Sequence, residues 1–390
     1  AAWGVGGGGL VRVGQHVWAP GAGWTPRLAG TGAGAADLVL VFGAPAALER
    51  SGAAATVRQA HPGAVVAGCS TAGEIAGARV LDDRVTATTI RLDDGSASLC
   101  TAELADAGGD SLAVGARLAA SLEPSGLRHV LVFSDGLHVN GSALVRGLVA
   151  GLGDEVVVTG GLAGDGDRFA RTRVVAGGTA APGRVAAVGL YGDRLRLGAG
   201  SMGGWDSFGP DRLITRAEGN VLYELDGRSA LELYRTYLGP HADGLPASGL
   251  LFPLRLTGED GEEGVVRTIL AVDDENDAMI FAGDLPVGAY ARLMHANFDR
   301  LVDGAVGAAR AGSASLGDGP AELALLISCV GRKLVLGQRV EEEVEAVRDV
   351  LGPEAVLTGF YSYGEISPHR AETGCELHNQ TMTITTLCEG

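Results

Sequence analysis

Short apolar runs alternate with amphipathic stretches along most of this chain. Continuous apolar runs at 38–42, 130–133 and 324–328 are typical of strands that are covered on both faces. The threonine-studded runs at 85–92 and 381–387 alternate between polar and apolar residues, as antiparallel strands do. The pattern therefore predicts sheets that mix parallel and antiparallel strands.

Apolar residues at helical spacing predict helices between these strands. In the stretch after residue 337, Val340, Val344 and Val347 form one stripe, and three consecutive glutamates lie on the opposite face. The helices predicted in this way cover residues 110–122, 141–152, 287–306 and 338–351. A short strand is also expected at 10–18.

One strand–turn pattern recurs along the chain. VVAGCSTAGEI (65–75) and AVLTGFYSYGEI (355–366) each run from an apolar strand into a turn ending in Gly-Glu-Ile, so Glu74 aligns with Glu365. HVLVFSDG (129–136) and the VVVTGGLAGDG that ends at 166 form a third copy, in which Asp165 takes the place of those acids. Because the repeats are long and few, they indicate duplication of a domain and not a solenoid.

The length of 390 residues suits two domains. We predict a mixed α/β fold with two duplicated halves, each a mixed sheet flanked by helices. The expected segments are a Gly-rich N-terminal stretch at 1–36 with an edge strand, a first domain at 37–210 and a second at 211–390. Gly, Pro and polar residues near 205–220 mark the boundary between the domains.

The acidic net charge of the chain argues against two classes of binding partner. A net charge of −17 disfavours binding to nucleic acid or to anionic membranes, both of which recruit Lys and Arg. No apolar stretch approaches membrane-spanning length, and no signal peptide is visible. Five cysteines without CxxC spacing fit reduced thiols in a cytoplasm. The Gly-, Ala- and Arg-rich composition, with Lys333 as the only lysine, is typical of a GC-rich bacterial genome.

An ordered series of motifs resembles the FIST family, which has an N-terminal and a C-terminal FIST domain. The matching pieces are GCSTAGEI (68–75), LVFSDGLHVNG (131–141), GGLAGDG (160–166), GGW (203–205), GNVLYELDGRSALELY (219–234), ISCVGRK (327–333), GFYSYGEI (359–366) and HNQTMTITTL (378–387). The resemblance runs from about residue 37 to the end of the chain.

Membership of that family implies a cytoplasmic sensor of a small ligand, for which amino acids are the proposed class. Output is then expected through a separate signalling partner, such as a histidine kinase or a cyclic-nucleotide enzyme. Some FIST proteins are reported to bind haem and to respond to nitric oxide, so haem is the alternative ligand. An enzyme that uses Cys69 as its nucleophile is the alternative from another class; we expect no catalysis.

The ligand is expected where the turns meet beyond the carboxyl ends of the strands. Free backbone N–H groups in the Gly-rich turns suit an anionic group, the turn acids suit an ammonium, and Tyr361, Tyr363 and Trp205 would exclude water. The candidate ligand-binding residues are Cys69, Ser70, Thr71, Glu74, Asp135, Gly161, Asp165, Trp205, Arg332, Tyr361, Tyr363 and Glu365.

Each of these candidates also has a purely structural interpretation. The turn acids can cap helices or tie loops together, and Cys69 can fill a tight turn, since Phe360 occupies its place in the other copy. Arg332 and Lys333 either complement an anion or form a solvated basic pair. Asn140 is expected to cap the helix that follows it.

Histidines enter the prediction only as haem ligands. His138 lies in a loop, His295 is expected on the helix at 287–306, and His378 precedes the last strand. A hydrogen-bonded or exposed histidine is the ordinary interpretation of each. No CxxCH motif is present, so any haem would be bound without covalent attachment. No metal site is predicted.

Overall fold

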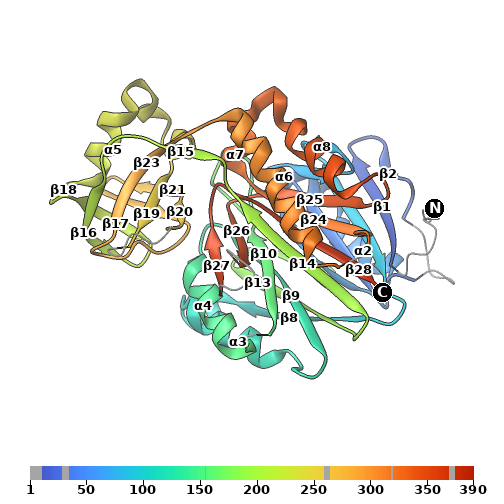
Figure 1. Cartoon of the computed structure of the whole chain (residues 1–390). Coiled ribbons are helices and arrows are strands. Elements are labelled where there is room, and N and C mark those ends of the chain that lie inside the picture. The colour runs from blue at the N-terminus through green and yellow to red at the C-terminus, as the bar shows by residue number, and fades with distance from the viewer. Residues whose placement is uncertain (1–10, 29–34, 154, 259–263, 318, 369–373) are drawn as a thin grey trace.

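The computed structural model describes residues 11–28, 35–153, 155–258, 264–317, 319–368 and 374–390. It consists of a large body that contains three sheets and a small unit that lies to one side (Figure 1). The glycine run at 6–9 and most of the segment at 30–36 lie outside the described residues. The mixed α/β class predicted from the sequence is confirmed.

The first sheet of the body has the strand order β12-β11-β4-β3-β7-β1-β2. Its strands are β1 (Arg12–Ala19), β2 (Gly23–Thr25), β3 (Leu38–Gly43), β4 (Val65–Ser70), β7 (Val85–Arg91), β11 (Val174–Ala176) and β12 (Thr179–Ala181). β3 and β4 are parallel, and β7 runs antiparallel to β3. The strand expected at 10–18 is therefore present as β1, but it pairs with both β7 and β2, so β2 and not β1 forms the edge of this sheet.

The second and third sheets also contain a parallel pair of strands with an antiparallel strand beside it, β10–β9 with β13 and β25–β24 with β28. The second has the order β27-β26-β10-β9-β13-β8 and the third the order β14-β28-β24-β25-β5-β6. The second contains β8 (Ser96–Glu103), β9 (Leu127–Ser134), β10 (Val157–Leu162), β13 (Arg184–Tyr191), β26 (Gly364–Pro368) and β27 (Cys375–His378). The third contains β5 (Glu74–Ala76), β6 (Arg79–Leu81), β14 (Leu195–Met202), β24 (Leu323–Cys329), β25 (Val356–Ser362) and β28 (Met382–Glu389).

Each parallel pair of strands is extended by a hairpin that follows a strand of another sheet. The hairpin β5–β6 follows β4 but pairs with β25, and β26–β27 follows β25 but pairs with β10. The hairpin β11–β12 follows β10 and pairs with β4, which closes the cycle. We call each parallel pair, with the strands that flank it in its sheet, a strand unit. The three strand units are therefore interlinked. Segments on both sides of the predicted boundary at 210/211 share the second and third sheets.

Glycine is required where the two parallel strands of each unit approach each other. A Cβ at Gly68, where φ is +151°, would lie 1.9 Å from the carbonyl oxygen of Val41 on β3. Gly160 and Gly359 have φ values of +155° and +158°, and a Cβ there would meet a carbonyl oxygen at 2.0 and 1.8 Å. The repeated glycines are thus explained by strand packing, because no L side chain fits these positions.

Helices cover the sheets of the body (Figure 1). They are α1 (Pro45–Ser51), α2 (Ala53–Ala60), α3 (Ser111–Ser121), α4 (Gly141–Leu152), α6 (Phe298–Ala314), α7 (Val330–Leu336) and α8 (Val340–Leu351), with 3-10 turns η1 (Leu104–Ala107) and η4 (Gly337–Arg339). In α8, Val344 and Val347 of the predicted stripe are buried. Asn140 caps α4 as expected, since its Oδ1 accepts a hydrogen bond from the N–H of Ala143 at 3.1 Å.

The small unit is a separate sheet with its own apolar core. It comprises β15 (Trp205–Ser207), β16 (Arg212–Glu218), β17 (Val221–Leu225), β18 (Arg228–Ser229), β19 (Leu254–Thr257), β20 (Val266–Arg267), β21 (Ile269–Asp273), β22 (Ala278–Phe281), β23 (Tyr290–Ala296), α5 (Ala230–Leu238), η2 (Gly239–Gly244) and η3 (Ala247–Leu251). Its core is formed by side chains that include Ile214, Leu231, Tyr234, Met279 and Phe281. The chain leaves the body after β14 and returns to it at α6.

The helix predicted at 287–306 is wrong in its first half. Residues Tyr290–Ala296 form β23, which pairs with β19, and α6 begins only at Phe298. Asn297 separates the two elements, because its side chain caps the helix by accepting a hydrogen bond from the N–H of Arg300. The apolar stripe that suggested one helix therefore combined the inward side chains of a strand with those of the next helix.

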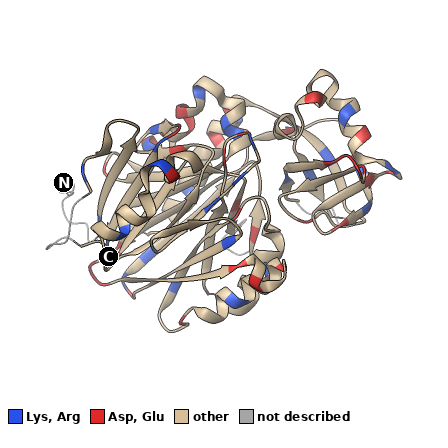
Figure 2. Ribbon diagram, turned by 180° about the vertical axis from the view of Figure 1, so that it is seen from behind, with Lys and Arg blue, Asp and Glu red and all other residues tan. Residues whose placement is uncertain are grey.

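Acidic and basic residues are interspersed along both parts of the molecule (Figure 2). Of the helices in the described part of the chain, none has the length and apolar character that a membrane crossing requires. At the centre of the body the rings of Phe42, Phe133 and Phe360 contact one another, with centroids 4.7 to 6.3 Å apart. Each of these rings comes from a different sheet, so they hold the three units together.

Candidate functional site

Loops from all three strand units converge on one pocket of about 260 Å³. The β4–β5 turn, the loop after β10 and the first turns of α7 contribute most of its wall. The lining residues are Ala44, Thr71, Ala72, Gly73, Glu74, Asp82, Asp83, Gly166, Asp167, Arg168, Val330, Lys333 and Leu334. The pocket therefore lies beyond the carboxyl ends of the parallel strands, where the sequence predicted it.

Lys333 is the cation with the most enclosed position in this pocket. Its side chain is 16% exposed, and its Nζ donates a hydrogen bond to the carbonyl oxygen of Ala72 at 2.8 Å and another to Asp82. The ammonium also lies 5.6 Å from the ring centroid of Tyr361. These contacts hold the only lysine of the chain at the pocket wall.

Glu74 is a buried acid of the same wall. Its Oε1 accepts a hydrogen bond from the Thr71 hydroxyl at 2.6 Å, and its Oε2 accepts one from the N–H of Arg84 at 3.3 Å. Burial raises the pKa of this carboxyl to about 8, although both donors and the nearby Lys333 favour the charged form. Glu74 is therefore mostly protonated at neutral pH.

More exposed charges of both signs complete the pocket. Asp82, Asp83 and Asp167 supply carboxylates. The guanidinium of Arg168 is the second cation of the wall. A pocket with both signs of charge suits a ligand that has an anionic and a cationic group.

The backbone N–H groups of the Gly-rich turns are largely engaged within the protein. The N–H of Ser70 donates to the carbonyl of Arg173 and that of Ala72 to the carbonyl of Tyr361, both at 2.8 Å. The N–H of Gly164 donates to the carbonyl of Ser70 at 2.9 Å. These three groups tie the loops together and are not free to bind a ligand anion.

Asp165 lies behind the pocket wall, where it organises the loop after β10. Its carboxylate accepts hydrogen bonds from the hydroxyl of Tyr363 and from the N–H groups of Ala170 and Arg171, the latter two at 3.1 and 2.9 Å. The expected equivalence with Glu74 is not found, because Val174 occupies the corresponding register position opposite Cys69. Asp165 and Tyr363 are both buried and bonded to each other.

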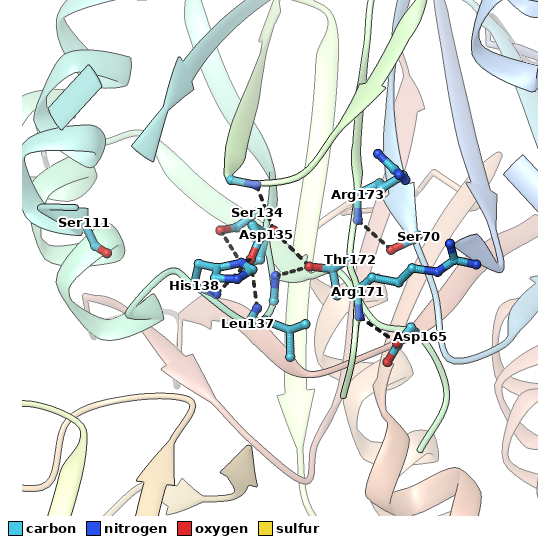
Figure 3. A network of polar contacts seen from close by, with 12 residues as sticks. Ser70, Ser111, Ser134, Asp135, Leu137, His138, Asp165, Arg171, Thr172 and Arg173 are labelled. Atoms are coloured by element: carbon cyan, nitrogen blue, oxygen red, sulfur yellow. Dashed lines mark hydrogen bonds and ion pairs between the residues drawn. The ribbon is translucent and has the colours of Figure 1, made fainter. Parts of the chain in front are cut away.

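Asp135 is the centre of a separate polar network (Figure 3). Its Oδ1 accepts from the N–H groups of Leu137 and His138 at 2.9 and 2.8 Å, and its Oδ2 accepts from Thr172 Oγ1 at 3.0 Å and Gly183 N–H at 2.9 Å. Burial alone would raise the pKa of this carboxyl, but the donors outweigh it and hold the pKa below its ordinary value. Ser70 joins neighbouring loops in the same view, since its hydroxyl accepts from the N–H of Arg173 at 2.9 Å.

Arg332 and Tyr361 meet at a buried glutamate instead of lining the pocket. The guanidinium of Arg332 is fully buried and contacts Glu343 Oε2 at 2.7 and 3.1 Å. The hydroxyl of Tyr361 donates to Glu343 Oε1 at 2.7 Å. Trp205 is also buried away from the pocket, and its indole N–H donates to the carbonyl of Gln380 at 3.1 Å.

Glu365 occupies the same type of site as Glu74 in a different sheet. Its carboxyl accepts hydrogen bonds from the Ser362 hydroxyl and from the N–H and hydroxyl of Thr381, the latter two at 3.2 and 2.9 Å. Burial raises the pKa of Glu365 to about 8. It does not line the 260 Å³ pocket, so the two repeated acids are separated.

Cys69 and Gly161 lie in the central core. The Cys69 side chain is completely buried, and burial raises its pKa well above the ordinary value. A Cβ at Gly161 would come within 2.8 Å of Ile327 and 3.3 Å of the ring of Phe360, so only glycine packs there without displacing its neighbours. Neither residue reaches the pocket wall.

The candidate haem ligands lie in three different environments. The side chain of His138 is 60% exposed and its Nδ1 lies 3.0 Å from Asp135. His295 is exposed on β23 and not on a helix. His378 is buried, with its Nε2 3.0 Å from the carbonyl oxygen of Ser367. Among the described residues, no group of three His, Cys, Asp or Glu side chains is placed to hold a metal ion.

Sequence reasoning missed four charged residues of the pocket wall. Asp82, Asp83, Asp167 and Arg168 lie outside the repeated motifs, so nothing in the repeat pointed to them. Lys333 was considered, with Arg332, as a partner for an anion but was not placed among the candidate ligand residues, although its status as the sole lysine was a usable signal. Of the predicted ligand residues, Thr71 and Glu74 line this pocket.

Comparisons with known proteins agree with the motif series. The FIST N domain matches residues 37–228 and the FIST C domain matches residues 230–368. FIST domains are small-ligand sensing domains of signalling proteins. No curated protein matches the chain.

Two solved structures share low similarity with this one. A crystal structure of chorismatase is 10% identical, with a TM-score of 0.34, and the match covers 96% of this chain and 98% of that chain. A cyanuric acid hydrolase from A. caulinodans is 12% identical, with a TM-score of 0.18, and the match covers 76% and 99% of the respective chains.

Proposed function

This chain belongs to the FIST family, and we propose that it senses a free amino acid, which binds in the 260 Å³ pocket at the convergence of the three strand units. The observation that carries the proposal is the presence of charges of both signs on one pocket wall, of which Lys333 is the most enclosed. An α-amino acid has a carboxylate and an ammonium close together, and few other small metabolites combine them in this way.

The carboxylate of the ligand is best placed against Lys333. This ammonium is largely shielded from solvent, so its attraction for an anion is less screened than that of a surface lysine. Arg168 is the second cation that can turn toward the same group, and its side chain is 58% exposed. A ligand carboxylate here would compete with Asp82 for Lys333. The affinity for the ligand therefore depends on how readily Lys333 exchanges Asp82 for the ligand carboxylate.

The ammonium of the ligand is best placed against the acidic side of the wall. Asp83 and Asp167 offer exposed carboxylates. Glu74 is mostly neutral at neutral pH because its pKa is about 8. An ammonium that binds beside it favours its charged form, so binding releases part of a proton and strengthens as the pH rises toward 8.

We propose binding without chemical conversion. Cys69, the candidate nucleophile of the β4–β5 turn, is fully buried, and burial raises its thiol pKa, which disfavours the thiolate that reacts. Output then passes to a separate signalling protein, for which a histidine kinase or a cyclic-nucleotide enzyme is the proposed class. The proposed location is the cytoplasm, consistent with the free cysteines.

Thermal-shift screening of the twenty protein amino acids, followed by calorimetry on those that stabilise the protein, tests this function. We expect at least one to bind, and Lys333→Met to weaken it by about tenfold or more, because the ligand carboxylate loses its enclosed partner. Glu74→Gln and Glu365→Gln form a matched pair of buried acids. Above pH 8 the first should weaken binding several-fold, and the second should leave it unchanged, since Glu365 does not line the pocket.

The opposite outcomes are equally specific. If no amino acid stabilises the protein, or if Lys333→Met binds as well as the wild type, the pocket is not the sensing site. A Soret absorption band in the protein as purified would favour the haem alternative. Turnover that is lost in Cys69→Ser would favour an enzyme.

A further inference from the structure

Arg332 connects α7 to both segments that lead into the small unit. Its Nη1 donates to the carbonyl oxygen of Gly203 at 3.2 Å, and its Nη2 donates to that of Leu301 at 2.7 Å. Gly203 lies between β14 and β15, where the chain leaves the body, and Leu301 lies in the first turn of α6, where the chain returns. We call these two segments, at 203–207 and 297–304, the linkers. One fully buried guanidinium therefore contacts both linkers.

The two linkers also pack tightly against each other at this point. A Cβ at Gly304 would lie 1.7 Å from the carbonyl oxygen of Gly203, and one at Gly204 would lie 2.3 Å from that of Arg300. Leu336, at the end of α7, packs in one apolar cluster with Trp205 and Leu301. Because Arg332 bonds to both linkers and Leu336 packs in the same buried cluster, a shift of α7 disturbs its contacts with at least one linker.

The opposite side of α7 forms part of the ligand pocket. Lys333 follows Arg332 directly in the chain and points to Ala72 and Asp82. A second connection runs through Tyr361, whose backbone carbonyl accepts from the N–H of Ala72 and whose hydroxyl donates to Glu343, the ion-pair partner of Arg332. The pocket and the linkers thus share α7 and the buried Glu343.

We propose that Arg332 is a positioning residue that couples occupancy of the Lys333 pocket to the placement of the small unit. This inference rests on the proposed function for the ligand, but the mechanical coupling itself is a property of the fold. A ligand carboxylate that draws Lys333 away from Asp82 displaces α7, and Arg332 transfers the displacement to Gly203 and Leu301. The small unit then presents a different surface to a signalling partner.

The coupling can be measured without any ligand, in the full chain. In the first arm, amide hydrogen exchange is followed in peptides that cover 203–207 and 297–304 in the wild type and in Lys333→Met. The substitution removes the contacts that hold α7 to Ala72 and Asp82, so exchange in both linkers should accelerate about fivefold or more, the lower range of measured couplings. Asp83→Asn, which changes a pocket charge outside α7, should leave both linkers unchanged.

The second arm works in the reverse direction, with substitutions outside the pocket. Lys333 is the only lysine, so reductive ¹³C-methylation gives one lysine resonance, which reports on the pocket and is absent from Lys333→Met, beside that of the N-terminal amine. Trp205 lies in the first linker, and its indole N–H bonds to the carbonyl of Gln380 in the body. Trp205→Phe removes this bond and should shift the Lys333 resonance. Tyr237→Phe removes a hydroxyl of the small unit that bonds to Arg212, away from the linkers, and should not.

Each result decides for or against the coupling. Faster linker exchange confined to Lys333→Met, together with a resonance shift confined to Trp205→Phe, supports it. Unchanged linker exchange in Lys333→Met, or equal effects of the variants and their controls, overturns it. Since neither arm contains an amino acid, a failure of ligand binding and a failure of coupling are distinguishable.

Discussion

Glu74 and Glu365 lie at equivalent register positions in two different sheets. Glu74 pairs with Phe360, the residue after Gly359, and Glu365 pairs with Gly161, the residue after Gly160. Each carboxyl is fully buried and accepts a hydrogen bond from a hydroxyl three residues earlier in the chain. The sequence repeat is therefore a structural repeat, and it places two acids with raised pKa values in the interior.

These two acids make stability dependent on pH. Burial raises both pKa values from 4.5 to about 8, so the folded protein retains protons that the unfolded chain has already released. The stabilisation is fully present below pH 4.5 and is lost as the pH rises to 8. At about 1.4 kcal/mol per pKa unit, we expect the free energy of unfolding to fall by several kcal/mol between pH 5 and pH 8.

Urea denaturation at several pH values checks this expectation. The double variant Glu74→Gln, Glu365→Gln should lose most of that slope, because an amide does not titrate. A wild-type stability that is flat or that increases between pH 5 and pH 8 would show that both carboxyls ionise normally.

Close packing of parallel strands makes the repeated glycines indispensable. Gly359→Ala places a Cβ 1.8 Å from the carbonyl oxygen of Leu326 and should destabilise the fold by about 3 kcal/mol or more. Gly63→Ala is the matched control, since nothing lies within 4 Å of a Cβ there. Thermal denaturation of the two variants checks the prediction, and similar melting temperatures would contradict it.

The periodicity of the sequence was sufficient for most of the body. Continuous apolar runs located β3, β9 and β24, because strands buried on both faces need an apolar side chain at every position. The small unit was less visible, since Met294 and Leu301 gave a false helical stripe across two elements. The exchange of hairpins between sheets leaves no periodic signal, so the interlinked arrangement was not predictable from the chain.

The candidate site was only partly predictable for a related reason. Repeats identify equivalent residues, and Glu74 and Glu365 were found in this way. The pocket, however, is lined by only one of the two acids. Only Glu74 faces Lys333, because α7 follows β24 and no repeat places a second lysine at the other acid. Arg332 was assigned to the ligand because both it and Lys333 follow a strand end; the helix turns them to opposite sides.

The buried ion pair of Arg332 should dominate the stability contributed by α8. Glu343→Gln leaves a fully buried guanidinium without its charged partner, which should cost about 3–5 kcal/mol. The neighbouring Glu342 pairs with Arg339 at 43% and 46% side-chain exposure, so Glu342→Gln should cost less than about 1 kcal/mol. Equal losses in chemical denaturation would contradict this assignment of the ion pair.

Cys69 should be inert in the folded protein. Its side chain is completely buried and its thiol pKa is raised, so iodoacetamide at pH 7.5 should not label it until the protein unfolds. Cys100, which is partly exposed, should react first of the two, although slowly, since burial raises its pKa to about 11. Peptide mass spectrometry after timed labelling measures both, and selective alkylation of Cys69 would favour the enzyme alternative.

The most direct test of the central claim is a titration of the ¹³C-methylated protein with each amino acid that stabilises it. Because Lys333 is the only lysine, its dimethyl-ammonium resonance is the only side-chain signal, and Lys333→Met distinguishes it from the signal of the methylated N-terminal amine. We predict a saturable shift of this resonance, with the same dissociation constant that calorimetry gives. Binding detected by calorimetry while the Lys333 resonance stays unchanged would place the ligand elsewhere and contradict the proposed site.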